Sequence, residues 1–324
     1  MTSMKTTAAG QQTGRVTVVG SLNMDLVIRA PRLPKEGETL AGRSFVNVPG
    51  GKGGNQAVAA ARLGAQVAMI GRVGNDDNGR QLVAGLRRDG IDCNGVTTDP
   101  TLPTGVAMIV VDDAGQNAIV IVAGSNGALT CAAMAVHASR IEQADVLVCQ
   151  LEVPDQTVLA AMNLARKHGR IVVLNPAPVT GPLERGWLES ADFLIPNELE
   201  ASALSGVPVE SPESARRAAR KLQQDGARNV IITLGKRGVV VLTEGDRAGD
   251  GGKHYLPAEV EAIDTTAAGD TFVGGFCAAL AAKRPLDEAV RFGQAAAALS
   301  VTRAGAQTSI PYLHEITLQV AASK

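Results

Sequence analysis

The sequence predicts an α/β fold with three α/β/α layers, in which helices cover both faces of a mainly parallel central sheet. Short runs of β-branched residues alternate with longer runs rich in alanine and leucine along most of the chain. Parallel strands need a crossover connection that is usually a helix, so this alternation is typical of a parallel sheet covered on both sides. Two other segments, 26–48 and 106–122, alternate apolar and polar residues with no helix interrupting them, which predicts a small antiparallel β sheet beside the main one.

Each element follows from its local pattern. The β-branched runs predict strands of the central sheet at 16–19, 66–70, 146–149, 171–174, 193–195, 230–233 and 239–242. The alanine-rich and leucine-rich runs predict helices at 57–63, 79–88, 157–167, 212–224, 271–282 and 286–302. The turn sequence DDAG at 112–115 predicts a hairpin, and the small sheet is either an edge of the main sheet or a lid over a cleft. We expect a flexible tail over residues 1–14, one domain over 15–324, and a lid formed by about 23–50 and 103–123.

The composition excludes several classes of function. The chain has 324 residues, and its 31 Lys and Arg nearly balance its 32 Asp and Glu, so the formal net charge is −1. A chain so close to neutral has little general attraction for nucleic acid. Only 5 Phe, 2 Tyr and 1 Trp are available to stack on bases. Glycine accounts for 36 residues, which predicts turns where the backbone approaches a ligand closely.

We expect a cytoplasmic protein that does not enter a membrane. Residues 114–139 carry no Asp, Glu, Lys or Arg, but GSNG at 124–127 interrupts them and predicts a strand, a turn and a helix instead of a membrane span. The first 14 residues lack the apolar segment of a signal peptide. The four cysteines show no metal-ligand spacing, so we interpret them as small buried residues in a reducing compartment.

A turn of small residues followed by a helix provides the first candidate site. Residues 262–275 read AIDTTAAGDTFVGG, and the helix is expected to begin near Asp270. Ala267, Ala268 and Gly269 have almost no side chain, which leaves their N–H groups able to hold an anion at the helix N-terminus. Asp270 is then either a favourable acid at the positive end of the helix or a base that takes a proton from an alcohol during phosphoryl transfer.

Two polar turns provide candidate residues for a small polar ligand. The sequence PGGKGGNQ at 49–56 is a glycine turn that opens a helix, but it is neither a P-loop nor a dinucleotide-binding motif. Lys52 and Asn55 supply hydrogen-bond donors there. Asn23 and Asp25 follow the first strand at alternate positions, so both can face one pocket at the carboxyl end of the sheet. Such residues are also common in simple turns.

The stretches GGKGGNQAVAAARLGA and DTTAAGDTFVGGF resemble the two motifs of the ribokinase/PfkB family of carbohydrate kinases. The resemblance extends over residues 15–311, which is nearly the whole chain. It implies a ribokinase-like fold and an ATP-dependent, in-line transfer of phosphate to O5 of D-ribose, with Asp270 as the general base. It also implies Mg²⁺ and K⁺ as cofactors.

The resemblance implies a role for each matching position. The sugar would be bound by Asn23, Asp25, Gly51, Lys52, Asn55, Glu152 and Asp270, and covered by Ala107 and Ile121. The transferred phosphate would be held by Ala267, Ala268 and Gly269. The nucleotide and Mg²⁺ would be held by Asn197, Glu200, Thr233, Leu234, Gly235, Lys236, Arg237, Gly238, Gly269 and Gln294. K⁺ would be held, partly through backbone carbonyls, by Asp264, Thr266, Ser300, Arg303, Gly305 and Ser309.

Physical arguments narrow the substrate within this family. The sugar side carries Asp25 and Glu152, with Lys52 as its one cation, so it favours hydroxyl groups over a phosphate. A nucleoside would need aromatic stacking, and Phe45 is the one aromatic residue before Trp187. Deoxyribose, fructose, another neutral sugar or a nucleoside remain alternatives, as does a non-catalytic protein that binds sugar or nucleotide.

Two further expectations come with the resemblance. At Gln294 relatives usually carry His or Asn, so the contact with adenine is expected to differ here. A projecting sheet with an apolar face often pairs with a second copy of itself, and we therefore expect a homodimer formed through the lids.

Overall fold

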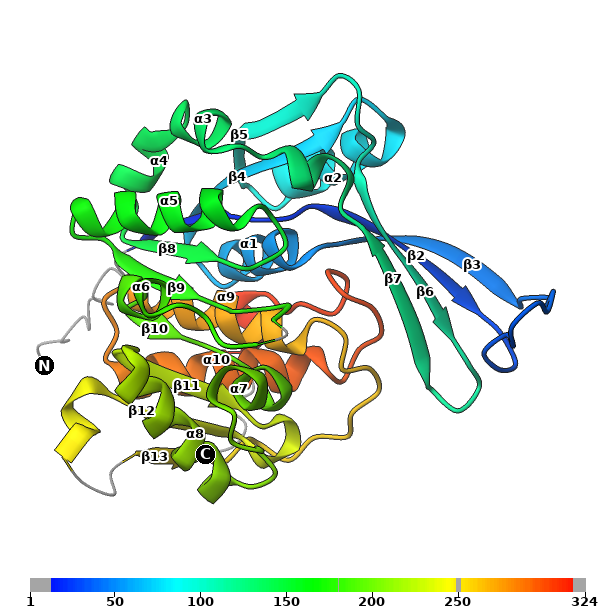
Figure 1. Cartoon of the computed structure of the whole chain (residues 1–324). Helices are drawn as coiled ribbons and strands as arrows, with labels where there is room; N and C mark the ends of the chain where they lie inside the picture. The colour runs from blue at the N-terminus through cyan, green and yellow to red at the C-terminus, as the bar shows by residue number, and fades with distance from the viewer. Residues whose placement is uncertain (1–12, 180, 249–251, 317–324) are drawn as a thin grey trace, which may run out of the picture.

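The computed structural model describes residues 13–179, 181–248 and 252–316, which form two β sheets flanked by helices (Figure 1). Most of the predicted N-terminal tail lies outside these described residues. The larger sheet has nine strands in the order β13-β12-β11-β10-β9-β8-β1-β4-β5. Its strands are β1 (Arg15–Val19), β4 (Gln66–Gly74), β5 (Asp92–Asp99), β8 (Val146–Cys149), β9 (Ile171–Leu174), β10 (Phe193–Leu194), β11 (Asn229–Thr233), β12 (Val239–Leu242) and β13 (Lys253–Tyr255). The strands from β11 to β5 are parallel, and the pairs of β12 with β11 and β13 are antiparallel. The predicted α/β fold with a mainly parallel sheet is confirmed.

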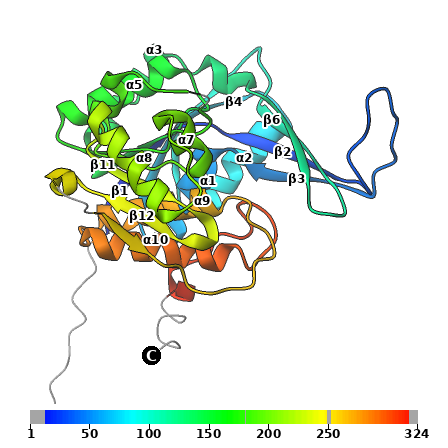
Figure 2. The same cartoon turned by 60° about the horizontal axis from the view of Figure 1, so that its bottom comes forward.

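Helices cover both faces of the large sheet, as Figures 1 and 2 show from two directions. One apolar core joins the sheet to α1 (Lys52–Arg62), α2 (Asp77–Arg88), α9 (Ala268–Ala281) and α10 (Leu286–Ser300). The core on the opposite face includes α3 (Cys131–Ala135), α4 (Ala138–Glu142), α5 (Asp155–Lys167), α6 (Arg185–Ser190), α7 (Glu198–Ser205) and α8 (Pro212–Asp225). Among the described residues, no helix is both long and apolar enough to cross a membrane.

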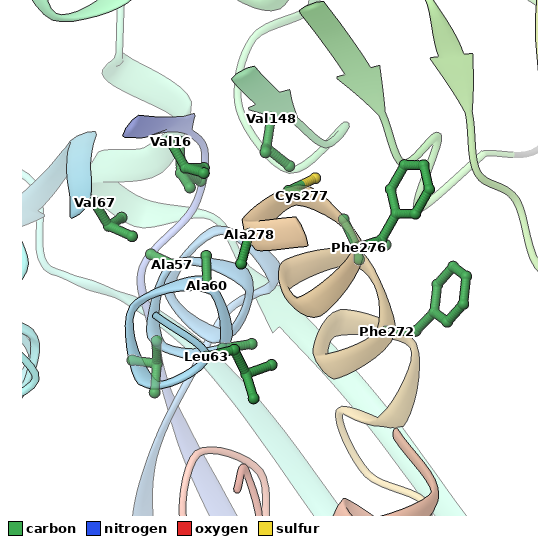
Figure 3. Close-up of a cluster of buried hydrophobic side chains, with 14 of the residues drawn as sticks. Val16, Ala57, Ala60, Leu63, Val67, Val148, Phe272, Phe276, Cys277 and Ala278 are labelled. Atoms are coloured by element: carbon green, nitrogen blue, oxygen red, sulfur yellow. The ribbon is translucent and has the colours of Figure 1, made fainter. Parts of the chain in front are cut away.

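Helices α1 and α9, which carry the two glycine-containing motifs, pack directly against each other (Figure 3). Their contact is close because Gly274 presents no side chain: a Cβ there would lie 2.8 Å from the carbonyl oxygen of Gln56. Phe272 and Phe276 on α9 stack with their ring centroids 6.1 Å apart and fill the neighbouring core. This packing fixes the start of α9 relative to the start of α1, where the candidate residues lie.

The smaller sheet has four strands in the order β3-β2-β6-β7 and projects from the body of the molecule (Figure 1). These strands are β2 (Asn23–Arg29), β3 (Ser44–Gly50), β6 (Gly105–Val111) and β7 (Asn117–Val122). The two outer pairs are antiparallel, and β2 runs parallel to β6 in the centre. The hairpin predicted at 112–115 joins β6 to β7, with Gly115 at a φ of 78°. Since this sheet shares no strand with the large one, it is not an edge of the main sheet.

Three differences from the predicted elements have local causes. Helix α1 begins at Lys52, five residues before the predicted start, because Gly51 adopts a φ of 82° and turns the chain there. Gly53 and Gly54 are then tolerated inside the helix because it packs on the backbone near Ser21, which leaves no room for a Cβ at Gly53. Strand β5 has a polar sequence and lies at the sheet edge, and β13 has only three residues, so neither gives a strong strand pattern.

Candidate active site

Asp270 lies in the first turn of α9 with its carboxylate buried and both oxygens hydrogen-bonded. Asn55 Nδ2 donates to Oδ2 at 2.9 Å, and Gln56 Nε2 donates to Oδ1 at 2.9 Å. These donors stand 215 and 214 residues away in the sequence and reach Asp270 because α1 packs on α9. Asn55 Oδ1 is buried without a partner in the described part of the chain, so it remains available to accept a hydrogen from a ligand hydroxyl.

The turn before Asp270 presents backbone N–H groups at the helix N-terminus. Ala267 adopts the left-handed conformation, with a φ of 58°, and directs the chain into the helix. Ala268 N already contacts Thr265 O at 3.2 Å. The N–H of Gly269 has no hydrogen bond to any described residue, and the space beside its Cα is open. The space at Gly269 therefore leaves room for an anion, and the Ala268 N–H would have to give up a long hydrogen bond to join it.

The sugar side predicted from the sequence is built around β2 and the turn at 50–52. Asn23 is buried, and its Oδ1 accepts a hydrogen bond of 2.8 Å from Asn126 Nδ2. Glu152 Oε2 accepts hydrogen bonds from Ser21 Oγ and, at 3.0 Å, from the backbone N–H of Lys52. The Asp25 carboxylate lies over Gly50, where a Cβ would come within 2.6 Å of its Oδ1. Asn23, Asp25, Lys52, Asn55, Glu152 and Asp270 thus gather in one region.

Carboxylates dominate the electrostatics of this region. Burial raises the pKa of Asp25 to about 7, and the charges of Glu152 and Asp270 add to the rise. Burial opposes the charge on Lys52, but the carboxylates of Asp270, Glu152 and Glu200 outweigh this and raise the pKa of its ammonium group. Burial also raises the pKa of Glu200, against the hydrogen bond from the Asn197 backbone and the charge of Lys52. Lys52 is therefore a cation shared by Asp270, Glu152 and Glu200.

Ala107 and Ile121, the two residues expected to cover the sugar, share a face of the small sheet with Asp25. The strand register pairs Asp25 with Ala107, and Ala107 with Ile121. Directly opposite residues point to the same side of a sheet, so all three side chains lie on one face. Ala107 is buried, whereas Ile121 is 52% exposed.

Asn197 and Glu200 form a helix cap. Asn197 precedes α7 and accepts a hydrogen bond of 2.9 Å from Glu200 N, while Glu200 Oε2 accepts one of 2.8 Å from Asn197 N. This reciprocal capping box gives the N-x-x-E motif a structural function of its own. It also orients the buried Glu200 carboxylate toward Lys52 and Asp270, with which it interacts electrostatically.

The expected nucleotide loop follows β11 and is a single 3₁₀ turn, Gly235–Arg237. Gly235 and Gly238 have φ values of 53° and 88°, which explains the glycines at both positions. Thr233 ends β11, and Leu234 is buried, so Leu234 could offer a ligand only its backbone. Arg237 pairs with Glu198 and donates to the carbonyl of Glu210.

Gln294 lies on α10 and is buried. Its Nε2 donates to the carbonyl oxygen of Tyr255 at 3.0 Å, so one amide hydrogen is already used within the protein. This bond ties α10 to the end of β13.

The residues expected to hold K⁺ come from two segments that the structure brings together. Ile263 N and Asp264 N donate to Val301 O, and Gly305 N donates to Asp264 Oδ2 at 2.8 Å. The other Asp264 oxygen accepts from Thr266, and Arg303 pairs with Glu315. The hydroxyls of Ser300 and Ser309 both donate to backbone carbonyls. Two loops rich in oxygen atoms, as here, present the oxygen ligands that hard cations prefer.

Sequence reasoning missed several residues that the structure places in the site. Gln150 and Asn175 follow β8 and β9, and both form hydrogen bonds with the buried side chain of Gln56. Asn126 holds Asn23 and the backbone of Leu22. Asn23 was identified because it lies in the polar stretch that follows the first strand, and polar residues after β8 and β9 could in the same way have identified Gln150 and Asn175.

The mainly parallel sheet, the small sheet beside it and the acidic site at the start of α9 all lie within the residues that match one protein family. Residues 13–313 match the pfkB family carbohydrate kinase, and the chain belongs to that family. The predicted family is therefore confirmed.

Similar proteins agree with this assignment. The chain is 45% identical to a ribokinase of Haemophilus influenzae over 93% of its own length and 96% of the relative's. It is 36% identical to a deoxyribokinase of Salmonella typhimurium over 93% of its length and 96% of the relative's. The structure of Arabidopsis thaliana ribokinase complexed with ribose and ATP matches 95% of this chain and 98% of that one, with a TM-score of 0.88 and 32% sequence identity.

Proposed function

We propose that this protein is an ATP-dependent ribokinase that transfers the γ-phosphate of ATP to O5 of D-ribose. The observation that carries this proposal is the buried Asp270 carboxylate at the start of α9, which is held by two side-chain amides and lies next to the backbone N–H of Gly269, unbonded among the described residues. The ribokinase names among the similar proteins and the ribose and ATP in the Arabidopsis structure support the choice of substrates.

In the proposed mechanism Asp270 accepts the proton of the O5 hydroxyl. The oxygen then forms a bond to the γ-phosphorus while the bond from phosphorus to the bridging oxygen breaks, and ADP leaves with that electron pair. The N–H of Gly269 and the helix N-terminus, together with Ala267 and Ala268, would stabilise the charge on the transferred phosphate. Lys52 would lie between this phosphate and the sugar.

The site also contains hydrogen-bond acceptors for the other sugar hydroxyls. Asp25 and Glu152 carry carboxylate oxygens, and Asn55 Oδ1 is buried without a partner among the described residues. Burying such an acceptor is costly unless a ligand donates to it. Gly51 and Asn23 would add contacts, and the apolar side chains of Ala107 and Ile121 would exclude water from above.

The residues present fit both expected cations. Glu200 would supply an oxygen near Mg²⁺ and the phosphates, and Asn197 would keep that carboxylate in place. The loops that contain Asp264 and Gly305 would hold K⁺ beside the anion site. Bound there, these cations would add positive charge near the transferred phosphate. The ATP itself would lie along residues 233–238, with Gln294 on its adenine side.

A panel of substrates tests the function. ADP release would be followed with D-ribose, 2-deoxyribose, fructose and nucleosides, each with and without K⁺, and the product position would be assigned by NMR. We expect ribose 5-phosphate as the main product. A preference for 2-deoxyribose would instead favour the second candidate function, for which the Salmonella deoxyribokinase is the supporting observation. Absence of turnover with every compound would support a non-catalytic binding protein.

Replacing the proposed base tests the mechanism. General-base catalysis typically contributes a factor of about 10² to 10⁴, so Asp270→Asn should lower kcat at least about 100-fold and leave ATP binding largely intact. Turnover close to that of the wild type would refute the role of Asp270.

We also propose that the enzyme is a cytoplasmic homodimer joined through its small sheets. Strand β7 is an edge strand, and its Ile119, Val120, Ile121 and Val122 are all exposed. An exposed apolar edge is a ready site for pairing with a second copy. The four cysteines are free thiols, which suits a reducing compartment.

A further inference from the structure

Gln56 is a buried glutamine whose amide is hydrogen-bonded on both sides and which contacts the proposed base. Its Nε2 donates one hydrogen to Asp270 Oδ1 at 2.9 Å and the other to Asn175 Oδ1 at 3.0 Å. Its Oε1 accepts a hydrogen bond of 2.6 Å from Gln150 Nε2. Rotating the amide by half a turn would set its oxygen against two other oxygens, so the orientation is fixed.

The neighbours of Gln56 are themselves anchored to the main sheet. Asn175 follows β9, and its Nδ2 donates to the carbonyl of Ile195 at 2.8 Å, which turns its oxygen toward Gln56. Gln150 follows β8 directly. A continuous chain of buried amides therefore runs from the ends of three adjacent strands, through α1, to the carboxylate on α9.

We propose that Gln56 is a positioning residue for the phosphoryl-transfer reaction, which holds the Asp270 carboxylate in the rotation needed to reach the sugar alcohol. This inference rests on the proposed role of Asp270. Asn55 also holds Asp270, but its Oδ1 has no hydrogen-bond partner among the described residues and is free to accept from a ligand. In Gln56, by contrast, both amide hydrogens and the amide oxygen are already used within the protein. Misplacing a reacting group by about 1 Å can cost about 100-fold in rate.

The test is a double-mutant cycle measured by steady-state kinetics on the full-length enzyme. Gln56→Met removes both donated hydrogens and keeps the length of the side chain. We expect kcat to fall about 10- to 100-fold, with the KM values for ribose and ATP within about threefold of the wild type. Made on top of Asp270→Asn, the same change should cost less than about threefold further, because its effect passes through Asp270.

A matched control removes a buried glutamine elsewhere. Gln223 on α8 is similarly buried, and its Nε2 also donates twice, to the carbonyls of Arg228 and Thr243. Gln223→Met should lower the thermal midpoint as Gln56→Met does but change kcat less than about twofold. Gln56→Glu, which keeps the shape but replaces the donor with a carboxylate oxygen, gives a second measurement should Gln56→Met fold poorly. We expect it to lose at least as much kcat.

The outcomes distinguish the proposed role of Asp270 as the base from the proposed role of Gln56 in positioning it. Near-normal turnover of Asp270→Asn alone would overturn the role of Asp270 and with it that of Gln56. If Asp270→Asn is impaired, the positioning role is refuted by an unchanged kcat in both Gln56 variants, by losses that multiply fully in the double mutant, or by a change in KM alone. A loss of kcat confined to enzymes that retain Asp270 supports it.

Discussion

Asp25 should make the ligand-free protein less stable at high pH, and replacing it should reverse this. Its pKa rises from 3.8 to about 7 on folding, because burial and the charges of Glu152 and Asp270 disfavour the carboxylate. The folded protein therefore binds more protons than the unfolded chain between these two values. Stability contributed by the protonated group is present below about pH 4 and is lost as the pH rises through 7.

The size of the effect follows from the shift. One pKa unit corresponds to about 1.4 kcal/mol, so a rise of about three units costs up to about 4 kcal/mol at pH 8. Asp25→Asn keeps the shape and removes the charge. It should raise the free energy of unfolding at pH 8 by about 2–4 kcal/mol, or the thermal midpoint by roughly 3–6 °C for a chain of this length. At pH 5 the gain should fall to about 1–2 kcal/mol, because only the interval from the unfolded pKa of 3.8 up to pH 5 then contributes.

The assay is thermal unfolding without ligand at pH 5 and pH 8, followed by circular dichroism. Asp113→Asn is the control, because it removes an exposed carboxylate of the same sheet that pairs with Arg43, and such surface pairs contribute little. The variant should also bind ribose about 10-fold or more weakly, since it loses a charged acceptor. Equal gains at both pH values, or no gain at pH 8, would show that the carboxylate of Asp25 is not the cause.

Three further predictions concern packing and assembly. Gly274→Ala should lower the free energy of unfolding by about 1–3 kcal/mol in urea titrations because its Cβ meets the backbone of α1, whereas Gly186→Ala, with open space around it, should not. Gly50→Ala should raise the KM for ribose at least about 10-fold by displacing Asp25, and an unchanged KM would contradict the contact. Val120→Asp should convert the proposed dimer to a monomer in light scattering, with exposed Val136 as the control position; a monomeric wild type at micromolar concentration would exclude the dimer.

The fold was largely predictable because its signals are local. Strand and helix periodicity, and the helix that follows each glycine turn, depend on residues within a few positions of one another. Strands β5 and β13 escaped prediction because they are polar or very short and hold their conformation through the neighbouring strand. Helices α4, α6 and α7 also escaped prediction, since each has eight residues or fewer and gives little helical periodicity. The start of α1 was misjudged because glycines normally disfavour a helix, and only the packing of Gly53 on the turn near Ser21 explains them.

The candidate residues were predictable as a set, whereas the hydrogen bonds that they form were not. The sequence indicated that Asp270 begins a helix and that Asn55 follows a glycine turn, and the family resemblance connected the two. It did not indicate that Asn197 and Glu200 cap each other, or that Gln294 bonds to Tyr255.

The sequence by itself determined the class of fold, the two glycine turns and the acids beside them, because each of these depends on residues that are neighbours in the chain. Only the tertiary structure decided that Gln56, Gln150 and Asn175 form one chain of amides behind Asp270, and that burial among like charges shifts the pKa of Asp25. Hydrogen bonds between side chains and the desolvation of a carboxylate depend on distances of a few ångströms between segments far apart in the chain. Such distances are set when α1 and α9 pack together on the sheet, and no local pattern encodes them.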